Sequence, residues 1–90
     1  MTRFIYYYAN WNSQCKLMTS ILNELQEEFP TMKLIRINNE VNGSKKRITP
    51  AVPLIVVEED EKEVLKLLGF KTKNSLSKII KEYVDRKSVV

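Results

Sequence analysis

The feature that most constrains the fold is a run of apolar residues near the N-terminus. Residues 3–8 (RFIYYY) are rich in aromatic and β-branched side chains, which favour β-strands. Nearly every position in the run is apolar, instead of every second one, so we expect both faces of this strand to be covered. The run therefore predicts a central strand in a layered α/β protein.

The segment that follows predicts an amphipathic helix. Asn12 and Ser13 are both good helix N-caps. After them, apolar side chains recur at helical spacing until Pro30, which cannot continue a helix. We expect roughly four turns of helix with one face packed on the sheet. The apolar stripe consists of Cys15, Met18, Ile21, Leu22, Leu25 and Phe29.

Three more strands and a final helix are predicted downstream. Residues 32–37 alternate apolar and basic side chains, while residues 54–57 and 63–68 form two strands around an acidic turn at residues 58–61. Apolar residues at helical spacing predict the last helix, with Asn74 or Ser75 as its cap. Residues 38–46 have the polar composition of a loop, with room for one short helix, and the tail from Arg86 is expected to be disordered.

The order of these elements is β-α-β-(short α)-β-β-α, and a chain of 90 residues fits one domain, residues 1–90. The first βαβ unit should be parallel with a right-handed crossover. The last two strands are joined by a short turn and should be antiparallel. The sequence therefore predicts a mixed sheet flanked by helices.

Composition excludes several kinds of chemistry. The chain has one cysteine, Cys15, and no histidine. One thiol cannot form an internal disulfide, and without histidine the chain holds no Cys–His zinc site and no Ser–His or Cys–His catalytic pair. A formal charge of +4 is too mild to predict a nucleic-acid partner. No apolar run is long enough for a bilayer or a signal peptide, so we expect a cytoplasmic protein with no membrane attachment. We also expect a monomer that holds no metal and no cofactor.

One short segment resembles a known active site. Residues 9–16 (ANWNSQCK) are similar to the segment of the thioredoxin family in which a strand runs into Ala-x-Trp-Cys-x-x-Cys-Lys. Trp11, Cys15 and Lys16 match this motif, and Asn12 stands where the first cysteine belongs.

Two further anchors support the resemblance. Residues 52–55 (VPLI) are similar to the segment in which the family holds a cis proline, here Pro53, against the active site. Gly69 ends the last strand before the final helix, as in the family. The resemblance covers roughly residues 3–84. It implies a thioredoxin-like fold of glutaredoxin size, with a four-stranded mixed sheet in the order 2-1-3-4.

The chain also departs from the family at three places. Asn12 can cap a helix but cannot attack a disulfide. Tyr6 stands where thioredoxin has a buried aspartate that assists proton transfer, and the turn at residues 59–61 lacks the expected glycine. The first two departures remove chemistry, so we expect no dithiol/disulfide cycle and no disulfide reductase turnover.

Cys15 and Trp11 each have two interpretations. Cys15 is either a monothiol that cycles through a sulfenic acid or mixed disulfide, or a small buried hydrophobe, and the apolar stripe predicts that its sulfur is buried. Trp11 is either a flat contact surface for a partner or a side chain that packs across the turn. The resemblance implies that the backbone at Val52 pairs with an extended segment by strand addition.

Two functions follow from these interpretations. The preferred one is a protein-binding module that holds a protein or peptide partner, which itself can contain a thiol, without redox turnover. The alternative is a monothiol thiol–disulfide redox protein that acts through Cys15 in cell redox homeostasis. The surface expected for binding consists of Trp11, Asn12, Ser13, Gln14, Val52 and Pro53.

Overall fold

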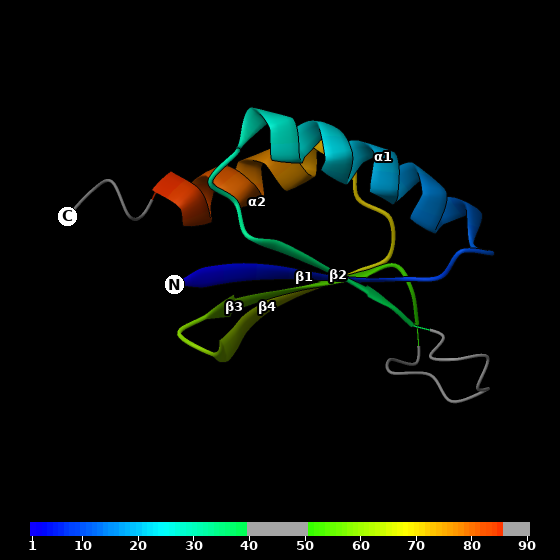
Figure 1. The fold of residues 1–90 in the computed structure, drawn as a ribbon, viewed down its shortest axis with the longest axis horizontal. Coiled ribbons are helices and arrows are strands. Elements are labelled where there is room, and N and C mark those ends of the chain that lie inside the picture. Colours follow the sequence, from blue (N-terminus) through cyan, green and yellow to red (C-terminus); the bar gives the residue numbers. More distant parts are fainter. Residues whose placement is uncertain (40–50, 86–90) are drawn as a thin grey trace.

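Four strands form one mixed sheet, and two helices pack on it (Figure 1). The computed structural model describes residues 1–39 and 51–85. The strand order β2-β1-β3-β4 confirms the order predicted from the sequence. β1 runs parallel to β2 and antiparallel to β3, and β3 and β4 form an antiparallel hairpin. The elements are β1 (Thr2–Tyr8), α1 (Ser13–Glu28), β2 (Leu34–Asn38), β3 (Leu54–Glu59), β4 (Lys62–Leu68) and α2 (Lys73–Asp85).

Two predictions fall outside the described residues, in whole or in part. The expected loop at residues 38–46 begins inside β2, whose last residue is Asn38, and its residues 40–46 lie outside the described part of the chain. The expected tail from residue 86 lies outside it as well.

The aromatic run of β1 contributes to both faces of the sheet. Phe4 and Tyr6 point toward α1 and α2, which lie on the same face (Figure 1). Ile5 points to the other face, where it packs with Leu54 and Val56. The uninterrupted apolar character of this strand is explained by burial on both sides. The core on the helix side consists of Phe4, Tyr6, Met18, Leu22, Leu25, Met32, Ile55, Val57, Leu76, Ile80 and Tyr83.

The two helix starts are built differently. Asn12 is the N-cap of α1, and its side-chain oxygen accepts a hydrogen bond from the Cys15 N–H at 3.0 Å. The prediction of Asn74 or Ser75 as cap of α2 is wrong. Instead, Thr72 Oγ1 accepts from the Ser75 N–H at 3.2 Å, and the Thr72 carbonyl accepts from the Leu76 N–H at 3.0 Å. The hydroxyl of Thr72 therefore starts α2 before the expected residues.

The β3–β4 turn is shorter than the predicted acidic turn at residues 58–61. Glu58 belongs to β3, where it lies opposite Arg3 of β1, and the two side chains form a salt bridge at 2.6 Å. Only Asp60 and Glu61 make the turn, and both have positive φ, 51° and 69°. Two-residue hairpin turns with positive φ at both positions favour glycine, which this turn lacks.

This strain gives a stability prediction. The Glu61→Gly variant should unfold at a higher temperature, because glycine adopts positive φ without a Cβ clash. We expect a net gain of about 0.5 to 1 kcal/mol, or about 4 °C in Tm, measured by thermal unfolding followed by circular dichroism. Glu61→Ala is the matched control, since it removes the same charge but keeps a Cβ. An equal gain in both variants would show that charge, not backbone strain, is responsible.

Candidate functional site

The three anchors identified in the sequence meet at one end of the sheet. If the β1–β3 register that pairs Tyr7 with Leu54 is continued by two residues, Ala9 lies opposite Val52. In Figure 1 the green segment that leads into β3 passes the end of β1 where α1 begins. The Val52–Pro53 peptide bond is cis, as the resemblance implied. The Gly69 N–H donates to the Pro53 carbonyl at 2.8 Å and so fixes the end of β4 beside this segment.

Asn12 acts as a structural group at the position where a nucleophile would stand. Its amide oxygen accepts the hydrogen bond from the Cys15 N–H at 3.0 Å, which satisfies one of the free N–H groups at the helix start. An amide cannot attack a disulfide sulfur. The first step of a dithiol cycle therefore has no group to perform it.

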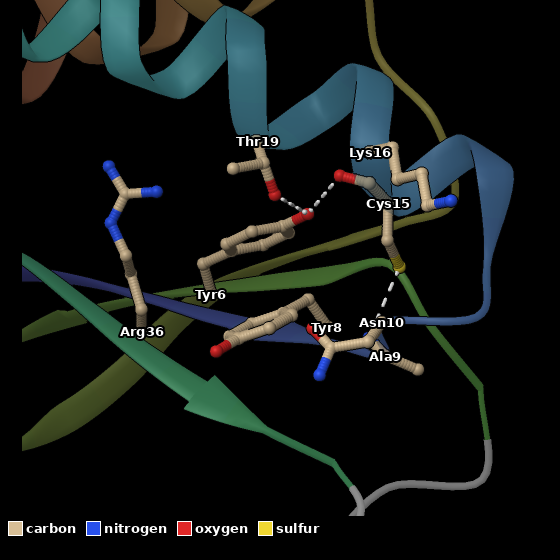
Figure 2. A pocket seen from close by; sticks show the side chains of 8 residues that line it. All are labelled: Tyr6, Tyr8, Ala9, Asn10, Cys15, Lys16, Thr19 and Arg36. Carbon is tan, nitrogen blue, oxygen red and sulfur yellow. Dashed lines mark hydrogen bonds between the residues drawn. The ribbon is translucent and has the colours of Figure 1, made fainter.

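Cys15 is buried, as predicted, and its side chain is a free thiol that is only 1% exposed. The Ala9 N–H lies 3.5 Å from the sulfur and donates to it (Figure 2). Cys15 also lines a groove of about 560 Å³ beside α1. The thiol is thus held in place from the strand side and closed to large disulfide substrates.

Tyr6 lies behind the site and is fully buried. Its hydroxyl donates to the Cys15 carbonyl at 2.9 Å and lies 3.2 Å from Thr19 Oγ1 (Figure 2). Burial raises the pKa of Tyr6 to about 12, although the hydrogen bond from Thr19 and the charge of Arg36 act in the opposite direction. A phenol with this pKa stays protonated at neutral pH, so Tyr6 offers no base for thiol chemistry.

The exposed part of the site is aromatic and polar. The Trp11 indole is 59% exposed, which favours a contact surface over packing across the turn. Ser13 and Gln14 are exposed beside it, and Val52 is half-buried. The Pro53 side chain is less than 2% exposed, so any contact at this position comes from Val52 and the backbone.

Sequence reasoning missed Phe70. This side chain is 37% exposed and follows Gly69, whose N–H is bonded to the Pro53 carbonyl. Phe70 therefore lies at the same end of the sheet as Trp11 and Val52, and we call these three residues the Trp11 surface. The only sequence signal was a large apolar residue between Gly69 and the polar segment that leads into α2.

A metal-binding cluster and a membrane-spanning helix are both absent from the part of the chain that the structure describes. Within residues 1–39 and 51–85, no three histidine, cysteine, aspartate or glutamate side chains are grouped so that they could hold a metal ion. None of the helices in the same ranges combines the length and apolar character needed to span a membrane.

The mixed sheet, the Trp-x-x-x-Cys segment at the start of α1 and the adjacent proline together define a thioredoxin-like protein. The sequence profile of the Thioredoxin family matches residues 2–82, and the chain belongs to this family. Only one cysteine is present, so the chain lacks the dithiol CxxC motif.

Several known proteins are similar to this chain. The thioredoxin of Chlamydia trachomatis is 28% identical over 79 residues, which cover 86% of this chain and 78% of the relative. The thioredoxin of Listeria monocytogenes is 26% identical over 85 residues, covering 87% and 79% of the two chains. Among solved structures, malaria parasite thioredoxin-2 superposes with a TM-score of 0.78 at 20% identity, covering 91% of this chain and 82% of its own. Mitochondrial thioredoxin 3 of Saccharomyces cerevisiae superposes with a TM-score of 0.73 at 25% identity, covering 90% and 77%.

Proposed function

We propose that this member of the thioredoxin family is a protein-binding module that holds an extended segment of a partner protein at the Trp11 surface, without disulfide reductase turnover. The proposal rests on the difference in solvent exposure between two residues that are close in the sequence, Cys15 and Trp11. The chain's single thiol, Cys15, is 1% exposed, whereas Trp11 in the turn before it is 59% exposed. The thiol is therefore buried, whereas the indole is exposed to solvent and available for contact with a partner.

The backbone beside Pro53 supports an extended partner. β3 begins at Leu54, and neither the N–H nor the carbonyl of Val52 bonds to another described residue. Free backbone groups next to a strand can accept an additional strand, which gives affinity through main-chain hydrogen bonds. Trp11 and Phe70, which are exposed at the same end of the sheet, would then add apolar contacts. None of these interactions needs a thiol on the binding module.

The proposal predicts a binding defect in one aromatic variant. Peptides selected from a random display library on the immobilised chain, with a non-thiol reductant present, should bind the unchanged chain. The Trp11→Ala variant should bind them at least about 10-fold more weakly, because aromatic side chains carry much of the energy of such contacts. Val64→Ala is the matched control, since Val64 is apolar and 44% exposed on β4. Isothermal titration calorimetry measures both, and equal affinities in the two variants would contradict the proposal.

A specific contact favours the alternative of a monothiol redox protein. The Ala9 N–H donates to the Cys15 sulfur, and an N–H donor stabilises negative charge on sulfur in a mixed-disulfide exchange. The two functions are separated by Cys15→Ser, a nearly isosteric change. A binding module keeps its peptides in this variant and in the presence of reductant. A monothiol protein captures disulfide partners by thiol–disulfide exchange, loses them in Cys15→Ser, and releases them when reductant is added.

A further inference from the structure

A groove of about 560 Å³ runs between α1 and the edge strand β2. The half-buried Tyr8 ring of β1 forms its accessible floor, over the buried Tyr6, and Thr19 of α1 and Arg36 of β2 also line it (Figure 2). Arg36 faces the helix because it is in register with Tyr6, whose side chain points to α1. This groove lies beside the Trp11 surface and is lined by different side chains.

The groove is positively charged. Nη2 of Arg36 donates to Asn23 Oδ1 at 2.7 Å and to Gln26 Oε1 at 3.3 Å, and both acceptors are neutral amides. Lys16 also lines the groove, on the far side of the tyrosine rings from Arg36 in Figure 2. Within the described part of the chain, no carboxylate forms a salt bridge with Arg36 or Lys16.

Arg36 keeps donors available for a ligand. A guanidinium has five N–H donors in a planar fork, and both of its bonds to described residues come from Nη2. The two amides on α1 hold the guanidinium in position without neutralising its charge. Because Nη2 is used by the two amides, the donors left for a ligand are the N–H groups of Nε and Nη1. These can form charge-assisted hydrogen bonds to the oxygens of a carboxylate or a phosphate group.

The floor of the groove adds an apolar contact. Tyr8 stacks on Tyr6 with ring centroids 5.5 Å apart and an interplanar angle of 23°. Tyr6 is itself fixed by its bond to the Cys15 carbonyl, so the half-buried Tyr8 ring is held in one orientation. A fixed ring contributes contact area at little entropic cost.

We infer that this groove is a binding site for a small organic anion. The carboxylate or phosphate group pairs with Arg36, the body of the molecule lies against Tyr8, and Lys16 adds to the positive potential. This site goes beyond the peptide-binding function, because its ligand is a small molecule and the three side chains that contact it, Tyr8, Lys16 and Arg36, belong to β1, α1 and β2.

The inference is tested by titrating the ¹⁵N-labelled full chain with four probes: phenyl phosphate, benzoate, phenol and inorganic phosphate. The two probes that carry both a ring and an anionic group should shift the amide signals of Tyr8, Asn10, Lys16 and Thr19. They should bind at least about 10-fold more tightly than phenol, and more weakly as salt is added. Tighter binding of phenyl phosphate than of benzoate identifies a phosphate ligand, and the reverse order a carboxylate.

Variants test whether Arg36 binds the anionic group of the probe. Arg36→Gln should weaken phenyl phosphate binding about 10-fold, and Arg36→Lys should weaken it less, because the charge stays while the planar guanidinium is lost. Lys62→Gln, at the hairpin end of β4, is the matched control for loss of one positive charge. The amide spectrum of each variant verifies its fold. Equal binding of phenol and phenyl phosphate, shifts that map elsewhere, or equal affinities in Arg36→Gln and Lys62→Gln would overturn the inference.

Discussion

The Asn12→Cys variant is expected to reduce insulin disulfides, with dithiothreitol as the electron donor, at least about 100-fold faster than the unchanged chain. The unchanged chain should show negligible turnover above the rate of dithiothreitol alone. The substitution rebuilds Trp-Cys-x-x-Cys-Lys at residues 11–16. One side chain thus separates this chain from the complete Trp-Cys-x-x-Cys-Lys motif.

The geometry of the helix start explains the size of this effect. The Asn12 side chain reaches the Cys15 N–H at 3.0 Å, so a thiol at position 12 would lie over the same turn as Cys15. A thiolate there is stabilised by the free N–H groups and the dipole of α1. After it attacks a substrate disulfide, Cys15 can resolve the mixed disulfide within the molecule, at high effective concentration. The buried Tyr6 supplies no base, so we expect the variant to stay below full thioredoxin activity.

Two control variants make this prediction specific. Asn12→Ser keeps a helix-capping oxygen and should remain inactive, whereas Asn12→Cys loses the cap at a cost of about 1 kcal/mol in the free energy of unfolding. Asn12→Cys combined with Cys15→Ser should form mixed disulfides that only an external thiol can resolve. Robust turnover by the unchanged chain that disappears in Cys15→Ser would establish a monothiol enzyme in place of a binding module.

The fold was predictable because its signals are local and agree with one another. The apolar run of β1, the stripe of α1 and the strand-forming residues of β3 each predict one element, and the family resemblance fixes their order. The errors lie at element ends. Glu58 favours a turn by its intrinsic propensity, but its backbone pairs with Arg3 of β1 and Glu63 of β4, so it belongs to β3.

Some residues of the candidate site could also be predicted from local sequence, and others could not. Trp11, Asn12 and Cys15 are close in the sequence, so their relation to the start of α1 could be derived from helix geometry alone. Phe70 reaches this site only through the connection after β4, and Arg36 reaches the neighbouring groove only through strand register. A basic residue in an alternating strand usually faces solvent, and only the tertiary structure shows that Arg36 faces α1. Contacts between distant segments set these positions, and one sequence does not encode them as a pattern.

The burial of Tyr6 predicts a loss of stability at alkaline pH. The pKa of Tyr6 is raised from 10.0 to about 12 in the folded protein. Because the folded pKa lies above the unfolded value, the stabilising effect is fully present below pH 10 and is lost as the pH rises toward 12. A difference of one between the folded and unfolded pKa corresponds to about 1.4 kcal/mol, so we expect the free energy of unfolding to fall by about 2 kcal/mol across this range. Urea unfolding at a series of pH values measures the fall.

Tyr6→Phe is the matched variant, since it removes the hydroxyl and keeps the ring. Near neutral pH it should be less stable by about 1 kcal/mol, because the bond from the hydroxyl to the Cys15 carbonyl is lost. It should also lack the part of the alkaline loss that comes from Tyr6. That loss, about 2 kcal/mol, exceeds the difference of about 1 kcal/mol near neutral pH, so the two stability curves should cross between pH 10 and 12. Ultraviolet difference spectra should show one fewer tyrosine ionising, and the missing step should lie near pH 12. Parallel stability curves for the two proteins would show that Tyr6 ionises without penalty and that its hydroxyl is not held as the structure places it.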